Sequence, residues 1–150
     1  MVELLIRQYR AHDAERVTEI IQRCLLEVNS RDYPPQIIDR LRAHYSAERV
    51  AELSGNRHVY VAETDRILGT VSRDGNKVYT MFVDPRCIGN GVGRQLMQYI
   101  EDLAAEEGHD YMETEASITA HDFYLRLGYT DLDENEGELG LTYSMRKRLR

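Results

Sequence analysis

The chain has 150 residues, of which 42% are hydrophobic and 30% are charged, and its formal net charge is −7 at pH 7. This length fits one domain with a core of ordinary size, so we expect a single domain over residues 1–150. The acidic balance argues against a nucleic-acid partner, which needs a basic surface, and weakly favours a cationic or amine substrate.

Composition also bears on the compartment and on metals. No apolar run approaches the roughly 20 residues of a membrane span, so we expect no membrane partner. The first residues, which include Glu3, do not resemble a secretory signal. Two cysteines, Cys24 and Cys87, are too few for a disulfide framework, so we expect a cytoplasmic protein. The histidines lack the spacing of metal ligands, and we expect no metal site.

The N-terminal third predicts one strand and then helices. Alternating apolar residues indicate a strand over residues 3–10. A helix capped by His12 or Asp13 should follow, because apolar residues recur there at helical spacing. These residues are Val17, Ile20, Ile21, Cys24, Leu25 and Val28. A second helix should open near Pro35, after an extended proline pair, and a short third one should end at Gly55.

From residue 58 the hydrophobic period changes to two, which is typical of strands. Three strands, over residues 58–64, 66–74 and 77–84, should form an antiparallel meander. A clear amphipathic helix should then run from Val92 to near Gly108.

The C-terminal part predicts a further strand over residues 110–117, a short helix capped by Thr119 and closed by Gly128, and a final strand within 137–150. The order β-α-α-β-β-β-α-β-α-β-β is typical of an α+β domain. We expect a mixed, mostly antiparallel sheet of six to seven strands flanked by about four helices. The strand–helix–strand unit around the glycine-rich loop should be parallel.

The segment "FVDPRCIGNGVGRQLM", residues 82–97, places Gly89, Gly91 and Gly93 directly before a predicted helix. Unpaired helix N-terminal amides bind anions, and glycines let a backbone curl around a phosphate. Taken alone, a simple turn remains the alternative. Arg94 stands where a dinucleotide fingerprint needs its third glycine, and no Gly-Lys-Ser/Thr follows, so neither NAD nor a Walker loop is favoured.

Two segments together carry a family resemblance. The run from Val83 to Met97 and the segment "EASITAHDFYLRLGY", residues 115–129, resemble two signatures of the GNAT superfamily of acetyl-CoA-dependent N-acyltransferases. With the order of elements, the resemblance covers essentially the whole chain. It implies a GNAT-like fold, acetyl-CoA as co-substrate, and direct acetyl transfer to a primary amine of a small molecule or peptide. The alternative is a non-catalytic acyl-CoA-binding or interaction module with the same fold.

The resemblance also implies roles for particular residues. Tyr124 would donate a proton to the coenzyme A thiolate, and a backbone N–H of the strand before the loop would stabilise the oxyanion. Ile88 and Ser117 depart from the Arg or Gln and from the Asn that are usual in the superfamily, and Asn90 and Val92 would act mainly through their amides. The implied cofactor contacts are Met81, Phe82, Val83, Ile88, Gly89, Asn90, Gly91, Val92, Gly93, Arg94 and Ser117.

The general base and the acceptor stay open. Thr80 stands near the place where many members have a Glu, so Glu27, Glu113, Glu115 or a water relay remain alternatives. Tyr33 is a candidate for the acceptor pocket and equally for a lid anchor. The oligomeric state is also open, with a homodimer as the commonest outcome for small enzymes.

Overall fold

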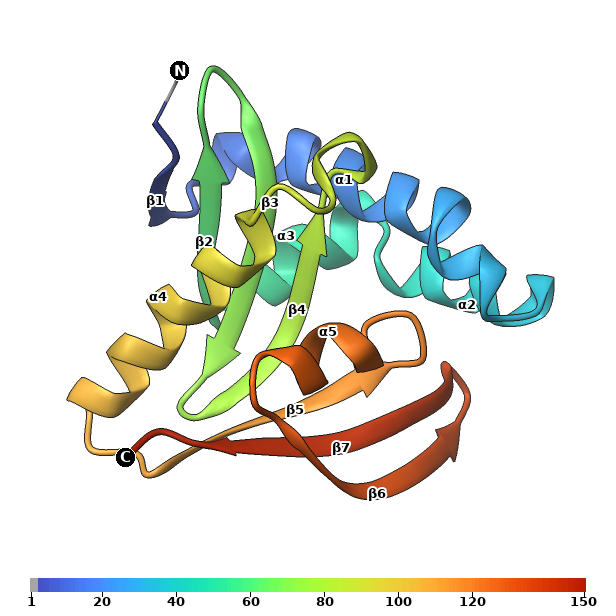
Figure 1. The fold of residues 1–150 in the computed structure, drawn as a ribbon. Helices are drawn as coiled ribbons and strands as arrows, with labels where there is room; N and C mark the ends of the chain where they lie inside the picture. The colour runs from blue at the N-terminus through green and yellow to red at the C-terminus, as the bar shows by residue number, and fades with distance from the viewer. Residues whose placement is uncertain (1–2) are drawn as a thin grey trace.

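The computed structural model describes residues 3–150, and Met1 and Val2 lie outside the described residues. One seven-stranded sheet has the order β1-β2-β3-β4-β5-β7-β6, with β4 and β5 parallel and the other neighbours antiparallel (Figure 1). The strands are β1 (Leu5–Gln8), β2 (His58–Glu63), β3 (Ile67–Asp74), β4 (Lys77–Val83), β5 (Tyr111–Ser117), β6 (Thr130–Gly137) and β7 (Gly140–Arg148). The helices are α1 (Ala14–Glu27), α2 (Pro35–His44), α3 (Ala47–Ser54), α4 (Val92–Glu106) and α5 (His121–Arg126). The predicted α+β class, including the parallel unit, is confirmed.

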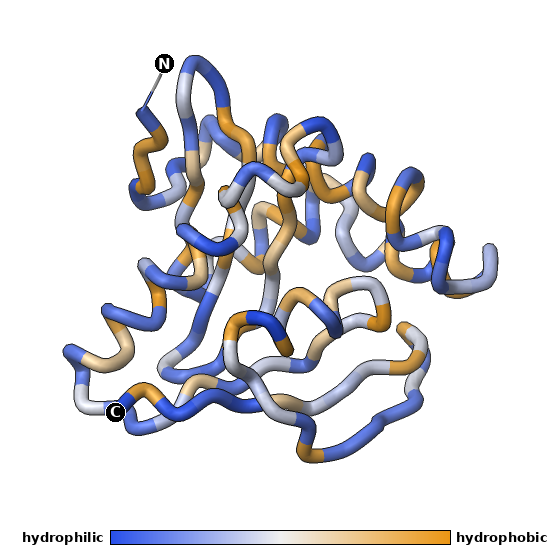
Figure 2. Tube along the Cα trace, in the orientation of Figure 1, coloured by the Kyte–Doolittle hydropathy of each residue, from blue (hydrophilic) through white to orange (hydrophobic). Residues whose placement is uncertain are grey.

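Two hydrophobic cores lie on opposite faces of the sheet. Helices α4 and α5 cover one face and α1 and α3 cover the other, while β6 is mainly hydrophilic along its length (Figures 1 and 2). The predicted stripe on the first helix is confirmed, because Val17, Ile20 and Ile21 are buried against Val50 and Val61. Each such side chain contributes about 1.5–3 kcal/mol by leaving water, so the cores fix which face each helix covers.

Helix α4 is also fastened to the sheet by a buried polar cluster. The Glu101 carboxylate, only 4% exposed, accepts hydrogen bonds from the Tyr129 hydroxyl at 2.7 Å and from the Lys147 ammonium at 2.8 Å. Burial and the nearby carboxylate raise the pKa of Tyr129. A buried carboxylate is tolerated only when it is paired in this way, so the cluster sets where α4 sits on β7.

Neither Asp13 nor Thr119 makes the side-chain capping bond that the sequence predicted, although Asp13 does occupy the N-cap position of α1. Asp13 immediately precedes α1, but its carboxylate accepts instead from the Arg10 N–H at 2.7 Å and from the Arg7 guanidinium at 2.8 Å. Thr119 does not cap α5, because its hydroxyl donates to Asp32 at 2.8 Å and Ala120 occupies the cap position. In both places a charged partner, Arg7 for Asp13 and Asp32 for Thr119, competes successfully with the local capping pattern, since charge-assisted hydrogen bonds are stronger.

Within residues 3–150, no helix is both long and apolar enough to cross a bilayer.

Candidate active site

The sheet opens between its two parallel strands. β4 and β5 pair through Lys77 with Glu113 and Val78 with Thr114, and they diverge beyond that point (Figure 1). The other edge of β4 stays paired with β3 as far as Val83. The β4 backbone groups that face β5 after Val78 therefore have no strand partner within residues 3–150. Such an edge can pair with an extended molecule that carries amide groups.

A bulge at Tyr79 turns the following β4 side chains to the other face. Val78 lies opposite Arg73 and Thr80 lies opposite Ser72, so Tyr79 has no partner on β3. Val78 consequently packs in the core under α4, whereas Thr80 lines the face covered by α1 and α3. The opening in the sheet is thus bordered by different side chains on its two faces.

The three loop glycines meet two different requirements. Gly89 and Gly91 have φ angles of 91° and 83°, which other residues adopt only with strain. Gly93 instead lies in close contact, because a Cβ there would stand 2.9 Å from Met81 Cε and 3.1 Å from Phe123 Cε1. The first pair shapes the loop, and the third lets α4 approach both β4 and α5.

The start of α4 leaves several amides free for a ligand. The first intrahelical bond is made by the Gln95 N–H to the Gly91 carbonyl at 3.1 Å, so the amides of Val92, Gly93 and Arg94 precede the ladder. The Asn90 N–H, which was predicted to face a ligand, donates to Cys87 O at 3.2 Å. Free amides and the helix dipole suit the loop to a phosphate or pyrophosphate group.

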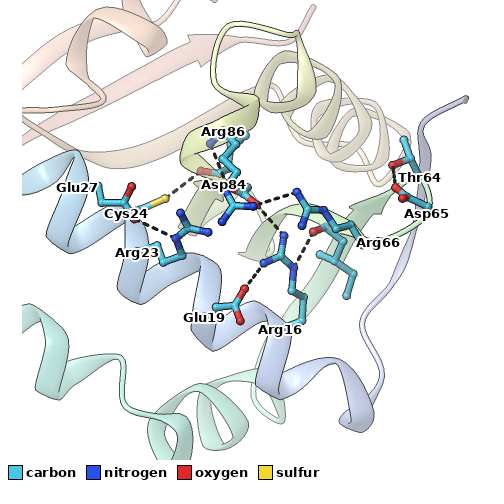
Figure 3. A network of polar contacts seen from close by, with 12 residues as sticks. Arg16, Glu19, Arg23, Cys24, Glu27, Thr64, Asp65, Arg66, Asp84 and Arg86 are labelled. Carbon is cyan, nitrogen blue, oxygen red and sulfur yellow. Dashed lines mark hydrogen bonds and ion pairs between the residues drawn. The ribbon is translucent and has the colours of Figure 1, made fainter. Parts of the chain in front are cut away.

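Charged residues anchor the base of this loop to α1 (Figure 3). Asp84 is fully buried and accepts from the Arg16 guanidinium at 2.7 Å and the Arg86 N–H at 3.0 Å. Although burial alone raises the pKa of Asp84, these two donors outweigh it and hold the pKa below its ordinary value. The Cys24 thiol adds a contact to Val83 O at 2.9 Å. No sequence pattern indicates this role of Arg16, because Arg16 lies 68 residues before its partner Asp84.

Tyr124 lies at the point where β4 and β5 part. Its side chain is only 3% exposed, and its hydroxyl lies close enough to Thr114, the last β5 residue paired with β4, for Thr114 to lower its pKa. Burial raises the pKa of Tyr124 to about 12, and the smaller effect of Thr114 opposes it. The phenol therefore keeps its proton at neutral pH and is available as a donor.

Tyr33 joins three segments beside the opening. Its hydroxyl donates to Leu141 O at 2.6 Å and accepts from the Ile118 N–H at 2.8 Å, and the side chain is 6% exposed. Ile118 directly follows Ser117, whose hydroxyl accepts from the Ala120 N–H at 3.1 Å. Because both hydrogen-bonding roles of Tyr33 are taken, its geometry suits an anchor better than an acceptor contact.

On the α1 and α3 face, the sequence offered no signal for a group of polar residues. One hollow there is lined by Tyr45, Arg57, Ser72 and Thr80, which come from four separate places in the chain. Burial raises the pKa of Tyr45, against smaller opposite effects from Arg57 and Thr80. Tyr45 packs against the core on this face, whereas Tyr124 belongs to the core under α4, so the two phenols lie on opposite faces of the sheet.

The three predicted candidate bases occupy different positions. Glu27 is bound to Arg23 at 3.0 Å on the exposed side of α1. Glu113 and Glu115 lie on β5, on the same face of the sheet as Lys77. The Glu115 carboxylate accepts from Ser144 Oγ at 2.7 Å. Glu113 lies just before the last paired β5 residue and Glu115 just beyond it, and no carboxylate replaces the side chain of Thr80 on β4.

Among residues 3–150, no group of three or more His, Cys, Asp or Glu side chains is arranged to hold a metal ion.

A family model described as an acetyltransferase (GNAT) domain matches residues 29–149. Because this match covers most of the chain, the protein belongs to the GNAT family of acetyltransferases, as its two signatures predicted.

Solved structures share the same fold. A GCN5-related N-acetyltransferase from Rhodopseudomonas palustris is 20% identical, with a TM-score of 0.90 over 99% of this chain and 98% of that one. The PaiA N-acetyltransferase from Thermoplasma acidophilum, solved with coenzyme A, is 17% identical, with a TM-score of 0.82 over 97% of this chain and 99% of that one. YncA from Salmonella typhimurium, solved with its cofactor acetyl-CoA, is 24% identical, with a TM-score of 0.64 over 99% of this chain and 95% of that one.

Proposed function

We propose that the protein transfers an acetyl group from acetyl-CoA to the primary amine of a small molecule or peptide, by direct attack in a ternary complex. The observation that carries this proposal is the meeting, in a GNAT-family chain, of an unpaired β4 edge, a free helix N-terminus and the buried Tyr124 hydroxyl. The loop amides suit the pyrophosphate, and the β4 edge suits the amide-bearing pantetheine arm.

The chain fits this ligand at each end of the opening. Gly89 and Gly91 leave the outer side of the loop open, since an added Cβ at Gly89 would meet nothing within 4 Å. Arg86 and Arg94 are exposed on either side of the glycines and add positive charge. Ile88, which is 54% exposed, stands where the superfamily usually has Arg or Gln, and its side chain cannot hydrogen-bond a phosphate. The backbone amides therefore carry most of the phosphate binding.

Acetyl transfer then needs a hydrogen-bond donor for the oxyanion of the tetrahedral intermediate and a group that stabilises the departing thiolate. An unpaired β4 N–H between Met81 and Val83 can donate to the carbonyl oxygen as it gains charge. A thiol has a pKa near 8.5, so full proton transfer from a phenol of pKa about 12 is uphill by roughly 5 kcal/mol. Tyr124 therefore stabilises the thiolate as a hydrogen-bond donor, and the proton released by the amine finally neutralises it.

The amine must lose a proton before or during attack, because a free alkyl amine has a pKa of about 10. Thr80 cannot accept it. Glu113 and Glu115 border the opening from β5 and can receive the proton through water, whereas Glu27 is engaged by Arg23. We therefore propose a water relay toward β5 as the route of deprotonation.

Because Thr80 stands where many family members have a Glu, a second candidate function is a non-catalytic acyl-CoA-binding module. One assay separates the two: the protein is incubated with acetyl-CoA and a panel of amines, free thiol is followed, and products are identified by mass spectrometry. Thiol release together with an acetylated amine supports the transferase. Coenzyme A binding without any turnover would favour the binding module.

A further inference from the structure

A small hollow lies between α1, α3 and the β3–β4 part of the sheet. Its volume is about 20 Å³, enough for one small polar group or an ordered water. Apolar residues of α1 and α3 form one wall, and the polar lining comes from Tyr45, Arg57, Ser72 and Thr80. Thr80 lies directly after the bulge, so the hollow adjoins the β4 segment that borders the proposed transfer site.

Two polar groups at this hollow make no hydrogen bond or ion pair with another side chain among residues 3–150. The Ser72 hydroxyl is buried, its residue is 3% exposed, and it makes no hydrogen bond within the described residues. The other serine and threonine hydroxyls of the lining outside β4 are satisfied, with Ser54 donating to Val50 O and Thr70 to Tyr60 O. A single unsatisfied hydroxyl in a hollow indicates a missing hydrogen-bond partner.

Arg57 is the second group. Its guanidinium lies over the Tyr79 ring, 4.0 Å from the centroid, at the edge of the hollow. In the part of the chain that the structure describes, no carboxylate lies within ion-pair distance of it. The neighbouring Arg49, in contrast, is paired with Glu52 at 3.0 Å. A half-buried guanidinium without a counter-charge is suited to bind a carboxylate.

The opposite side of the opening carries the opposite charge. Glu113 is the β5 partner of Lys77, and Glu115 follows on the same face, held by Ser144. Arg57 and Lys77 lie beside Tyr79 on the β4 side. Beside the apex, positive charge therefore lies on the β4 side at Arg57 and Lys77 and negative charge lies on β5 at Glu113 and Glu115, with Arg146 of β7 on the far side of Glu113.

We infer that the acceptor is a small amine that also carries a carboxylate, an amino-acid-like zwitterion, whose carboxylate binds Arg57 and the Ser72 hydroxyl while its amine points toward β5. This inference rests on the proposed transferase function and specifies its substrate class. It differs from the expectation drawn from the net charge, because a polyamine would bring a second cation to Arg57.

The test compares matched ligand pairs in calorimetric titrations of protein saturated with coenzyme A. Each pair is an amino acid and the amine left by its decarboxylation: L-lysine with 1,5-diaminopentane, L-methionine with 3-(methylthio)propylamine, and 4-aminobutanoate with propylamine. At least one amino acid should bind at least about tenfold more tightly than its partner, the scale of one charge-assisted hydrogen bond.

Variants assign the effect to the hollow. Arg57→Gln should remove most of the preference for the carboxylate, Arg57→Lys should keep part of it, and Ser72→Ala should weaken amino-acid binding several-fold. Arg49→Gln is the matched control and should change nothing, because Arg49 is already paired with Glu52. Circular dichroism confirms that each variant is folded.

Four outcomes would overturn the inference. Equal or tighter binding of the decarboxylated amines would show that the protein does not recognise the carboxylate. Equal losses of affinity for both members of each pair in Arg57→Gln would show that Arg57 does not bind it. Absence of amino-acid binding while coenzyme A binds would mean that the hollow holds only an ordered water, and would leave the transferase proposal intact. Failure of coenzyme A itself to bind would overturn both proposals.

Discussion

The two sides of the opening between β4 and β5 are built in different ways. The proposed cofactor side is contiguous in sequence, from Met81 to Arg94, and offers backbone groups and the glycines that shape them. The acceptor side gathers Tyr45, Arg57 and Ser72 from distant segments and relies on their side chains. A contiguous backbone site leaves a pattern in the sequence, whereas a dispersed side-chain site does not. Substitutions that separate backbone from side-chain roles test this contrast.

The largest effect is expected at Tyr124, where the two sides meet. Tyr124→Phe should lower kcat about 100-fold, because a positioned proton or hydrogen-bond donor contributes at least that much. The dissociation constant of acetyl-CoA, measured by calorimetry, should stay within about twofold, since the backbone holds the cofactor. Tyr99→Phe, a half-buried tyrosine of α4, serves as the control. Full turnover in Tyr124→Phe would show that another group serves the thiolate.

A smaller effect is expected when the loop backbone is disturbed. Gly91→Val should weaken acetyl-CoA binding about tenfold, because a φ of 83° costs a branched residue about 1–2 kcal/mol and the amides move with it. Ile88→Ala should change the affinity by less than about twofold, since that side chain is exposed and apolar. Isothermal titration of both variants provides the comparison. An Ile88→Ala variant as defective as Gly91→Val would contradict the backbone account.

Tyr33→Phe should act on the acceptor side through position alone. The change removes the donor to Leu141 O and the acceptor for Ile118 N–H, and the loss should cost about 1–3 kcal/mol of unfolding free energy. We expect the KM of the amine to rise about fivefold, with acetyl-CoA affinity nearly unchanged, in steady-state assays. Thr119→Ala removes the nearby exposed bond to Asp32 and should have little effect. If the KM of the amine in Tyr33→Phe stays at the wild-type level, Tyr33 has only a structural role.

The smallest effect is expected at Asp84, which anchors the loop to α1, and it concerns the pH dependence of stability. Its pKa is below the ordinary value in the folded protein, so its contribution to stability is complete above about pH 4 and is lost as the pH falls further. Asp84→Asn should be less stable at pH 7, and the difference in unfolding free energy should shrink below about pH 4. Urea unfolding at several pH values checks this. A difference that stays constant down to pH 2.5 would contradict it.

The sequence predicted the elements with strong periodicity and the glycine loop with its family, because these depend on local pattern. It predicted that Asp13 and Thr119 cap their helices, but neither side chain makes a capping bond, since their partners Arg7 and Asp32 come from tertiary contacts. It also gave no indication that a bulge at Tyr79 turns Thr80 toward the acceptor side, because a bulge is defined by the register of the neighbouring strand. The roles of the predicted cofactor contacts stay predictions.

The central claim is that backbone amides of β4 and of the glycine loop hold acetyl-CoA. Amide NMR spectra of labelled protein, recorded during titration with coenzyme A, test it most directly. We expect the largest shifts at Gly91, Val92, Gly93 and Arg94 and along Met81 to Val83, with small changes at Tyr45 and Arg57. Binding that leaves the loop amides unshifted while perturbing other parts of the sheet would contradict the account.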